Sequence, residues 1–446
     1  FRCTVFGIMK LLYMVLIILA VLVTNSKQSL LNDVLEATDP LLDALLNRFK
    51  ESLKSLDYEK IGSDFPSDAD NLLRYYLDLT NEDRYLDGFQ LLTKYGFTFK
   101  VYIVKTSDGY ILKVIRIPGK GSVVLLVHGL LFSWEDFLTS GPDFGLAYLL
   151  ARAGFDVWLL NCRGTKFSRD HTTLSPEDLK FWDFTWHEMG IKDLPATVDK
   201  ILSITGEEQL IYIGYSQGTT SAFVWLSECP EYNKVVKLLI CLSPVGYINH
   251  SKSPVLRGLT PFRNEEYAIF NTLGRGEILP RDNFSKIVQE LVCSTTVGAN
   301  IICSSVIFMV YGFDYYQLNF TNFPVQLAHQ PSGSSVKQFL HYLQGVASGY
   351  FRQFDHGKRR NLEIYKSEEP PNYNISNIVA PVALYYGKND WLADTIDVER
   401  LSEQIPNVVE KYLVPFDKFN HIDFLWAKDV IPLLYSRVLK LLKEYP

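Results

Sequence analysis

The sequence lacks the features that mark several large classes of protein. Its 446 residues carry a formal net charge of -6 with the two signs interspersed, which leaves no basic face for a nucleic acid. No internal repeat or low-complexity tract is visible. Cysteines and histidines do not cluster at the spacing of metal ligands, and no glycine-rich phosphate loop follows a strand. We therefore expect no nucleic-acid partner, no metal, no cofactor and no obligate protein partner.

The apolar run near the N-terminus is too short to span a bilayer comfortably. Met9 and Lys10 precede thirteen apolar residues, 11–23, and then Thr24, Asn25 and Ser26, whereas a transmembrane helix needs about 20. This pattern is typical of a secretory signal peptide. We expect residues 1–26 to be leader and signal peptide, with an uncleaved signal anchor as the alternative. The expected destination is extracellular, and the alternative is the lysosomal lumen.

Cysteine is scarce for a protein of the secretory pathway, where disulfides are permitted. The chain has six: Cys3, Cys162, Cys229, Cys241, Cys293 and Cys303. We expect Cys293 and Cys303, ten residues apart in one segment, to form the disulfide, and Cys241 to be a buried thiol in an apolar strand. Four sequons are candidate glycosylation sites: Asn249, Asn283, Asn319 and Asn374.

What the sequence does contain is a regular alternation of strand and helix patterns. Two strands, Phe99–Lys105 and Tyr110–Ile117, precede the wholly apolar run Val123–Val127. Further strands, with helical patterns between them, are expected at Phe155–Leu160, Leu210–Ile213, Val235–Leu242, Val382–Tyr386 and Val409–Val414. This alternation predicts an α/β fold with a mostly parallel, doubly wound sheet, whose active site lies beyond the carboxyl ends of the strands.

One long block interrupts the alternation. Residues 246–380 are irregular and rich in aromatics, and we expect them to form an inserted, mainly helical cap over the active site. The other predicted segments are an N-terminal helical extension at 27–80 and a core in two parts, 81–245 and 381–446. Within the cap, the apolar stretch Ile301–Met309 is either part of a lid or an ordinary buried helix.

The most informative motif is GYSQG at Gly214–Gly218, which follows the strand pattern Leu210–Ile213 and opens into a helical pattern. This strand–turn–helix context is that of a nucleophile elbow, a sharp turn that pushes the serine hydroxyl clear of the sheet. Gly214 and Gly218 are needed because a Cβ at either position would collide with the neighbouring strand or helix. Ser216 is therefore the predicted nucleophile.

A serine hydroxyl needs a base to take its proton and an acid to orient that base. In this arrangement the chain order is serine, acid, histidine. Asp390 follows the strand Val382–Tyr386 directly and is the predicted acid. Asp394 and Asp397 compete, but they fall at the start of the next helix, where N-terminal capping explains them.

His421 is the predicted base, because it is the histidine in the loop after the strand Val409–Val414. Two backbone amides are expected to stabilise the charge on the reacting carbonyl oxygen. One is that of Leu130 in the loop His128–Leu131, and the other is that of Gln217, directly after the nucleophile. The alternative interpretation is that Leu130 is an ordinary core residue that follows a strand.

These motifs stand in the order seen in the acid lipase family, which includes gastric, lysosomal acid and insect lipase-3-like proteins. The matching segments are HGLL at 128–131, NCRG at 161–164, FWDF at 181–184, GYSQGTT at 214–220, GFD at 312–314, PPNY at 370–373, DWLADT at 390–395 and NHIDFLWA at 420–427. The resemblance runs from about residue 81 to the end. It implies an α/β-hydrolase fold with a helical cap and a triad of Ser216, Asp390 and His421.

The expected function is that of a serine lipase acting on neutral lipid esters at a lipid–water interface through an acyl-enzyme on Ser216. Triacylglycerol is the first candidate substrate and cholesteryl ester the second. Two alternatives are a non-catalytic lipid-binding homologue and a carboxylesterase for short esters. No carboxylate pair visible in the sequence accounts for activity at acid pH.

Overall fold

The computed structural model describes residues 81–260, 263, 276–279 and 307–446. The expected leader and N-terminal extension lie outside these residues, as do Cys293, Cys303, Asn283 and most of the stretch 301–309. Within the described residues, no helix combines the length and apolar character needed to cross a membrane.

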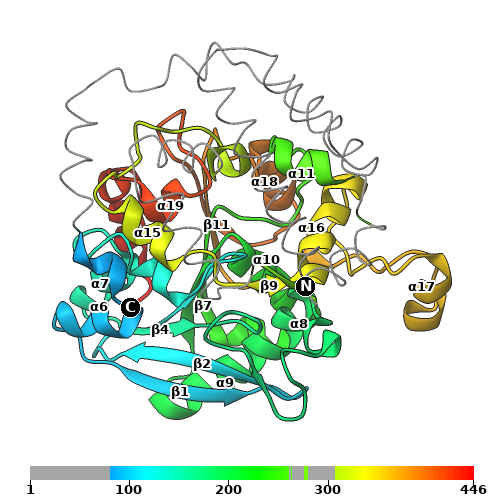
Figure 1. The fold of residues 1–446 in the computed structure, drawn as a ribbon, viewed down its shortest axis with the longest axis horizontal. Helices are drawn as coiled ribbons and strands as arrows, with labels where there is room; N and C mark the ends of the chain where they lie inside the picture. The colour runs from blue at the N-terminus through cyan, green and yellow to red at the C-terminus, as the bar shows by residue number, and fades with distance from the viewer. Residues whose placement is uncertain (1–80, 261–262, 264–275, 280–306) are drawn as a thin grey trace, which may run out of the picture.

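A mixed sheet lies at the centre of the molecule (Figure 1), with the strand order β1-β2-β4-β3-β6-β7-β10-β11 and β5 paired to β2. The strands are β1 Lys100–Lys105, β2 Tyr110–Ile117, β3 Val123–Val127, β4 Asp156–Leu160, β5 Asp170–His171, β6 Leu210–Tyr215, β7 Val236–Leu242, β10 Val382–Tyr386 and β11 Val408–Leu413. Every pairing from β4 to β11 is parallel, and β1, β2 and β5 pair antiparallel. The predicted mostly parallel sheet is confirmed.

Strand β3 explains why helices cover both faces of the sheet. All five of its side chains are buried, and successive side chains of a strand point to opposite faces. Val124 and Leu126 enter one core, which contains side chains of α7 and α20. Val123, Leu125 and Val127 enter the other core, which contains side chains of α9 and α10. A wholly apolar strand therefore requires a layer of helices on each side.

The helices alternate with the strands as predicted. They are α6 Gly88–Lys94, α7 Leu146–Arg152, α8 Trp186–Glu188, α9 Leu194–Thr205, α10 Gln217–Glu228, α11 Pro254–Leu259, α15 Phe323–His329, α16 Val336–Ser348, α17 Lys358–Tyr365, α18 Thr395–Ser402, α19 Asp423–Trp426 and α20 Ser436–Glu444. The prediction began the helix after the motif at Thr219, two residues late, because α10 starts directly after Ser216. Cys241 is a buried free thiol, as predicted.

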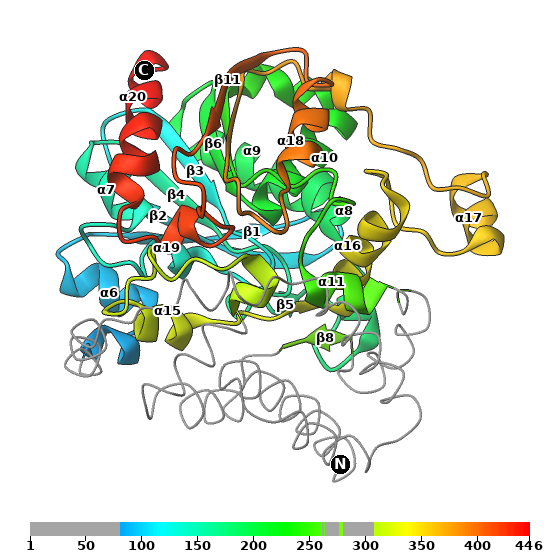
Figure 2. The same cartoon turned by 90° about the horizontal axis from the view of Figure 1, so that it is seen from above.

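The chain between β7 and β10 adds no described strand to the central sheet. It contains α11, α15, α16 and α17, together with a small two-stranded sheet of β8 (Glu277–Ile278) and β9 (Ser334–Ser335). Buried side chains of α11 and α16 join the core that contains α9 and α10, whereas those of α15 join the core that contains α7 and α20. In both views α17 stands out from the body of the molecule (Figures 1 and 2).

Candidate active site

Ser216 occupies a strained turn between β6 and α10. Its backbone has φ 51° and ψ −115°, a conformation that residues with a Cβ rarely adopt. The turn is tight because a Cβ on Gly214 would lie 2.7 Å from the carbonyl carbon of Gly218, and one on Gly218 would lie 2.2 Å from the Val127 oxygen. The predicted reason for both glycines is confirmed, and the turn has the geometry of a nucleophile elbow.

The structure brings together the three side chains predicted as nucleophile, base and acid. The Oγ of Ser216 lies 2.8 Å from Nε2 of His421. The Nδ1 of His421 lies 2.9 Å and 3.0 Å from the two carboxylate oxygens of Asp390. His421 and Asp390 are almost completely buried, and Ser216 is 8% exposed. A continuous hydrogen-bonded chain therefore runs from a buried carboxylate to a hydroxyl at the edge of solvent.

The carboxyl group of Asp390 is held in its charged form. Burial opposes ionisation, but the neighbouring His421 and the hydrogen bonds that the carboxylate accepts outweigh it and lower the pKa of Asp390. The amides of Leu392 and Ala393 each donate to Oδ1 at 2.9 Å. Asp390 can therefore orient the imidazole and stabilise the imidazolium that forms during proton transfer.

The two competing carboxylates have other partners. Asp394 caps α18 by accepting the amide of Ile396 at 2.9 Å, as predicted. Asp397 instead accepts from both the amide and the ring Nδ1 of His250, at 2.8 Å and 2.7 Å. Neither carboxylate lies against His421.

Ser243 is a member of this site that the sequence reasoning missed. Its Oγ lies 2.5 Å from Oδ2 of Asp390 and 2.7 Å from Nδ1 of His421. The residue directly follows β7, the strand between β6 and β10 in the sheet. A hydroxyl at the carboxyl end of the strand between those of the nucleophile and the acid is the sequence signal that points to it.

The loop predicted to supply an oxyanion donor passes close to the nucleophile. A Cβ on Gly129 would lie 3.0 Å from the Tyr215 ring and 3.2 Å from the Cβ of Ser216, so a side chain here would crowd the nucleophile. The ring of His128 accepts the Cys162 amide at Nε2, 3.1 Å away, and donates from Nδ1 to the Gly129 oxygen at 2.8 Å. Burial lowers the pKa of His128 to about 4, so a neutral imidazole ties the loop to the end of β4.

The amides of Leu130 and Gln217 are the two predicted donors. Gln217 is the first residue of α10, where backbone N–H groups have no partner within the helix. In the described part of the chain, neither amide donates a hydrogen bond to another group. The side chain of Gln217 is held aside by Met189 and by Gln338 of α16.

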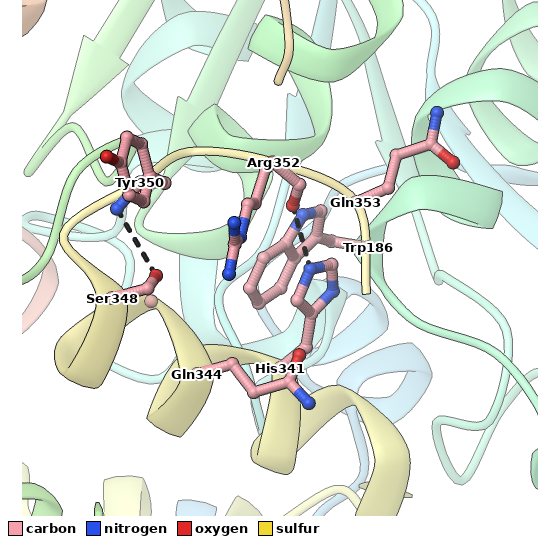
Figure 3. A pocket seen from close by; sticks show the side chains of 8 residues that line it. Trp186, His341, Gln344, Ser348, Tyr350, Arg352 and Gln353 are labelled. Carbon is pink, nitrogen blue, oxygen red and sulfur yellow. Dashed lines mark hydrogen bonds between the residues drawn. The ribbon is translucent and has the colours of Figure 1, made fainter. Parts of the chain in front are cut away.

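Figure 3 shows a hollow that does not belong to this site. It is lined by Trp186, His341, Gln344, Gly345, Ser348, Tyr350, Arg352 and Gln353. The imidazole of His341 stacks on Trp186 with centroids 3.6 Å apart and donates from Nε2 to the Arg352 carbonyl, 2.9 Å away. None of these residues hydrogen-bonds to the three predicted catalytic side chains.

Comparison with known proteins agrees with this architecture. Residues 122–428 match the family described as "alpha/beta hydrolase fold", and residues 89–141 match the "Partial alpha/beta-hydrolase lipase region". Lipase 1 of Drosophila melanogaster is 41% identical over 82% of this chain and 81% of its own. The human lysosomal acid lipase/cholesteryl ester hydrolase and gastric triacylglycerol lipase are each 37% identical over 80% of this chain and 90% of their own. The chain therefore belongs to the acid lipase family of α/β-hydrolases.

Proposed function

We propose that the protein is a serine lipase in which Ser216, His421 and Asp390 carry out the chemistry. The observation that supports this most directly is the hydrogen-bonded chain from Asp390 through His421 to Ser216. A base 2.8 Å from the hydroxyl is close enough to take its proton during attack on an ester carbonyl.

The reaction follows from this geometry. Ser216 Oγ attacks the carbonyl carbon as its proton passes to Nε2 of His421, and the ester carbonyl oxygen becomes an oxyanion. The amides of Leu130 and Gln217 are the proposed donors to that oxygen, and losing one such donor typically costs about 3 kcal/mol. His421 then protonates the leaving alcohol. Water, activated by the same ring, hydrolyses the acyl-enzyme and restores Ser216.

We propose neutral lipid esters as the substrate class. Two relatives carry names that describe their substrates as triacylglycerol and cholesteryl ester, and triacylglycerol is the first candidate here. Residues 246–380 are the proposed cap, because they add no described strand to the main sheet and lie between β7 and β10. The enzyme is proposed to act at a lipid–water interface.

The proposed destination is extracellular, with the lysosomal lumen as the alternative, since relatives include a gastric and a lysosomal lipase. Among the sequons within the described residues, Asn374 is exposed, whereas Asn249 and Asn319 are half-buried. We propose Asn374 as the glycosylation site that is best placed for a glycan. The disulfide between Cys293 and Cys303 stays a prediction.

Two assays test the function. A fluorophosphonate probe should label the folded wild type and fail to label Ser216→Ala. The same substitution should lower kcat on an emulsified triacylglycerol by about 10⁴-fold or more. Folded wild type that neither labels nor hydrolyses any ester would favour the non-catalytic lipid-binding homologue.

Chain length separates a lipase from a carboxylesterase. A lipase should hydrolyse emulsified long-chain esters at least as well as dissolved short-chain esters. Activity confined to dissolved short-chain esters would reassign the protein as a carboxylesterase with the same catalytic residues.

A further inference from the structure

The segment 311–314 lies between the loop that carries the proposed acid and the loop that carries the proposed base. The carbonyl of Tyr311 accepts the amide of Trp391 at 3.2 Å and the amide of His421 at 3.3 Å. Trp391 is the residue after Asp390. One carbonyl oxygen therefore binds both loops.

The next two carbonyls of the segment repeat this pattern. The side-chain amide of Asn420 donates to the Gly312 oxygen at 2.8 Å, and that of Asn389 donates to the Phe313 oxygen at 2.8 Å. Asn420 and Asn389 directly precede the base and the acid in the chain. The segment 311–314 is therefore hydrogen-bonded to the positions beside both residues and fixes the loops relative to each other.

Asp314, the last residue of the segment, places its carboxyl group against that of Asp423 in the base loop. Asp314 is 1% exposed and Asp423 is 3% exposed. The Oδ2 atom of Asp314 is buried and has no hydrogen-bond donor among the described residues. An ionised carboxylate can only accept hydrogen bonds, so a bond between the two groups requires a proton on one of them.

One oxygen of each carboxyl group accepts hydrogen bonds from backbone amides. Oδ1 of Asp314 accepts the amides of Tyr316 and Gln317 at 3.0 Å and 3.2 Å. Oδ2 of Asp423 accepts the amide of Asn420 at 2.7 Å. The pair thus joins the segment 311–314 to the backbone of the residue directly before His421.

We propose that Asp314 and Asp423 share one proton, and that this proton positions His421, so that loss of the proton sets an upper pH limit for the reaction. The inference rests on the proposed hydrolase function and names two positioning residues for it. Above the limit, two buried carboxylates repel each other and loosen the loop that holds the base.

The titration behaviour of the pair agrees with this geometry. Burial raises the pKa of Asp314 to about 6. Burial, and then the charge of Asp314, raise the pKa of Asp423 well above its usual range. No carboxylate pair is visible in the sequence because these two residues lie 109 positions apart in the chain.

The charged groups around the pair shift its pKa values in opposite directions. Lys418, in the loop before the base, lowers the pKa of Asp314. The carboxylate of Asp390 raises the pKa of Asp423. Tyr215 on β6 and Tyr311 face the same region, but burial raises the pKa of both phenols, so they remain neutral in the relevant range.

The first test compares the pH dependence of kcat/KM for wild type, Asp314→Asn and Asp429→Asn on a dissolved ester, from about pH 4 to about pH 9. The asparagine amide donates to Asp423 at every pH, so the upper limb of the Asp314→Asn profile should move to higher pH by about one unit or more. Asp429→Asn is the matched control, because Asp429 binds Gln317 near the pair without touching Asp423. Superimposable profiles for wild type and Asp314→Asn overturn the inference.

The second test separates the inference from the proposed function. Thermal unfolding is followed over the same pH range in Ser216→Ala and in the double variant that also carries Asp314→Asn. Because the folded-state pKa values are raised, the pair stabilises the fold at low pH and loses this contribution as pH rises through them. The Tm of the single variant should therefore fall more steeply with pH than that of the double variant. Parallel Tm curves overturn the inference of a shared proton. Diverging curves, together with a wild type that hydrolyses no ester, reject only the proposed function.

Discussion

The ring of Tyr311 lies parallel to the imidazole of His421, with centroids 5.4 Å apart and planes 6° apart. The aromatic face restricts rotation of the imidazole. It also stabilises the positive charge that His421 acquires when it takes the serine proton. Side-chain contact thus adds to the backbone hydrogen bond that joins the same two residues.

Removing this ring should slow the chemical step. Tyr311→Ala keeps the backbone carbonyl but loses the stacked face, so kcat should fall about fivefold, in line with the ~1 kcal/mol that such contacts contribute. Tyr311→Phe is the control, since it keeps the ring and should retain most of the activity. Steady-state kinetics on a dissolved ester measure both, and equal losses in the two variants would assign the effect to the phenol hydroxyl instead.

The positions of Ser216, Asp390 and His421 were predictable because each follows a predicted strand and their chain order is fixed in this strand–turn–helix arrangement. Ser243, Tyr311 and Asp314 were not predicted. Their contacts depend on which strands become neighbours in the sheet and on where the chain between β7 and β10 returns to it. The position of Ser243 after a strand marks it as a candidate, but local patterns do not record which distant side chains these residues contact, and the three-dimensional arrangement shows that.

Ser243 should affect both rate and pH dependence. Its hydroxyl donates to the Asp390 carboxylate, which helps to hold the pKa of Asp390 below its usual value. Ser243→Ala removes that donor, so the pKa of Asp390 should rise and the acid limb of kcat/KM should move to higher pH. We also expect kcat to fall about tenfold. An unchanged acid limb in a pH–rate profile would contradict this role.

Gly218 should tolerate no side chain. The added Cβ of Gly218→Ala would lie 2.2 Å from the Val127 carbonyl oxygen, and backbone on both sides must move to relieve the clash. We expect the free energy of unfolding in urea to fall by about 3 kcal/mol or more.

The matched control for this substitution is Gly206→Ala. Gly206 has φ 77° at the end of α9, but a Cβ there meets no atom within 4 Å. Only the strain of a left-handed alanine then applies, which amounts to about 1 kcal/mol. Similar decreases in the free energy of unfolding for the two variants would mean that the turn at Ser216 can relax around a methyl group.

A buried ion pair between Arg163 and Asp193 should be far more important for stability than an exposed one. Asp193 is fully buried and accepts from Nε of Arg163 at 2.8 Å and from its backbone amide at 3.1 Å. Among the described residues, Asp193→Ala leaves the buried guanidinium with Asp108 as its one carboxylate partner, so the free energy of unfolding in urea should fall by about 3–5 kcal/mol. The control is Asp143→Ala, which breaks an exposed pair with Arg152 and should cost less than about 1 kcal/mol.

Because Asp193 has no contact with the proposed triad, the Asp193 variant that remains folded at low temperature should keep its KM. A KM change larger than the stability loss explains would show that this ion pair also shapes the substrate site.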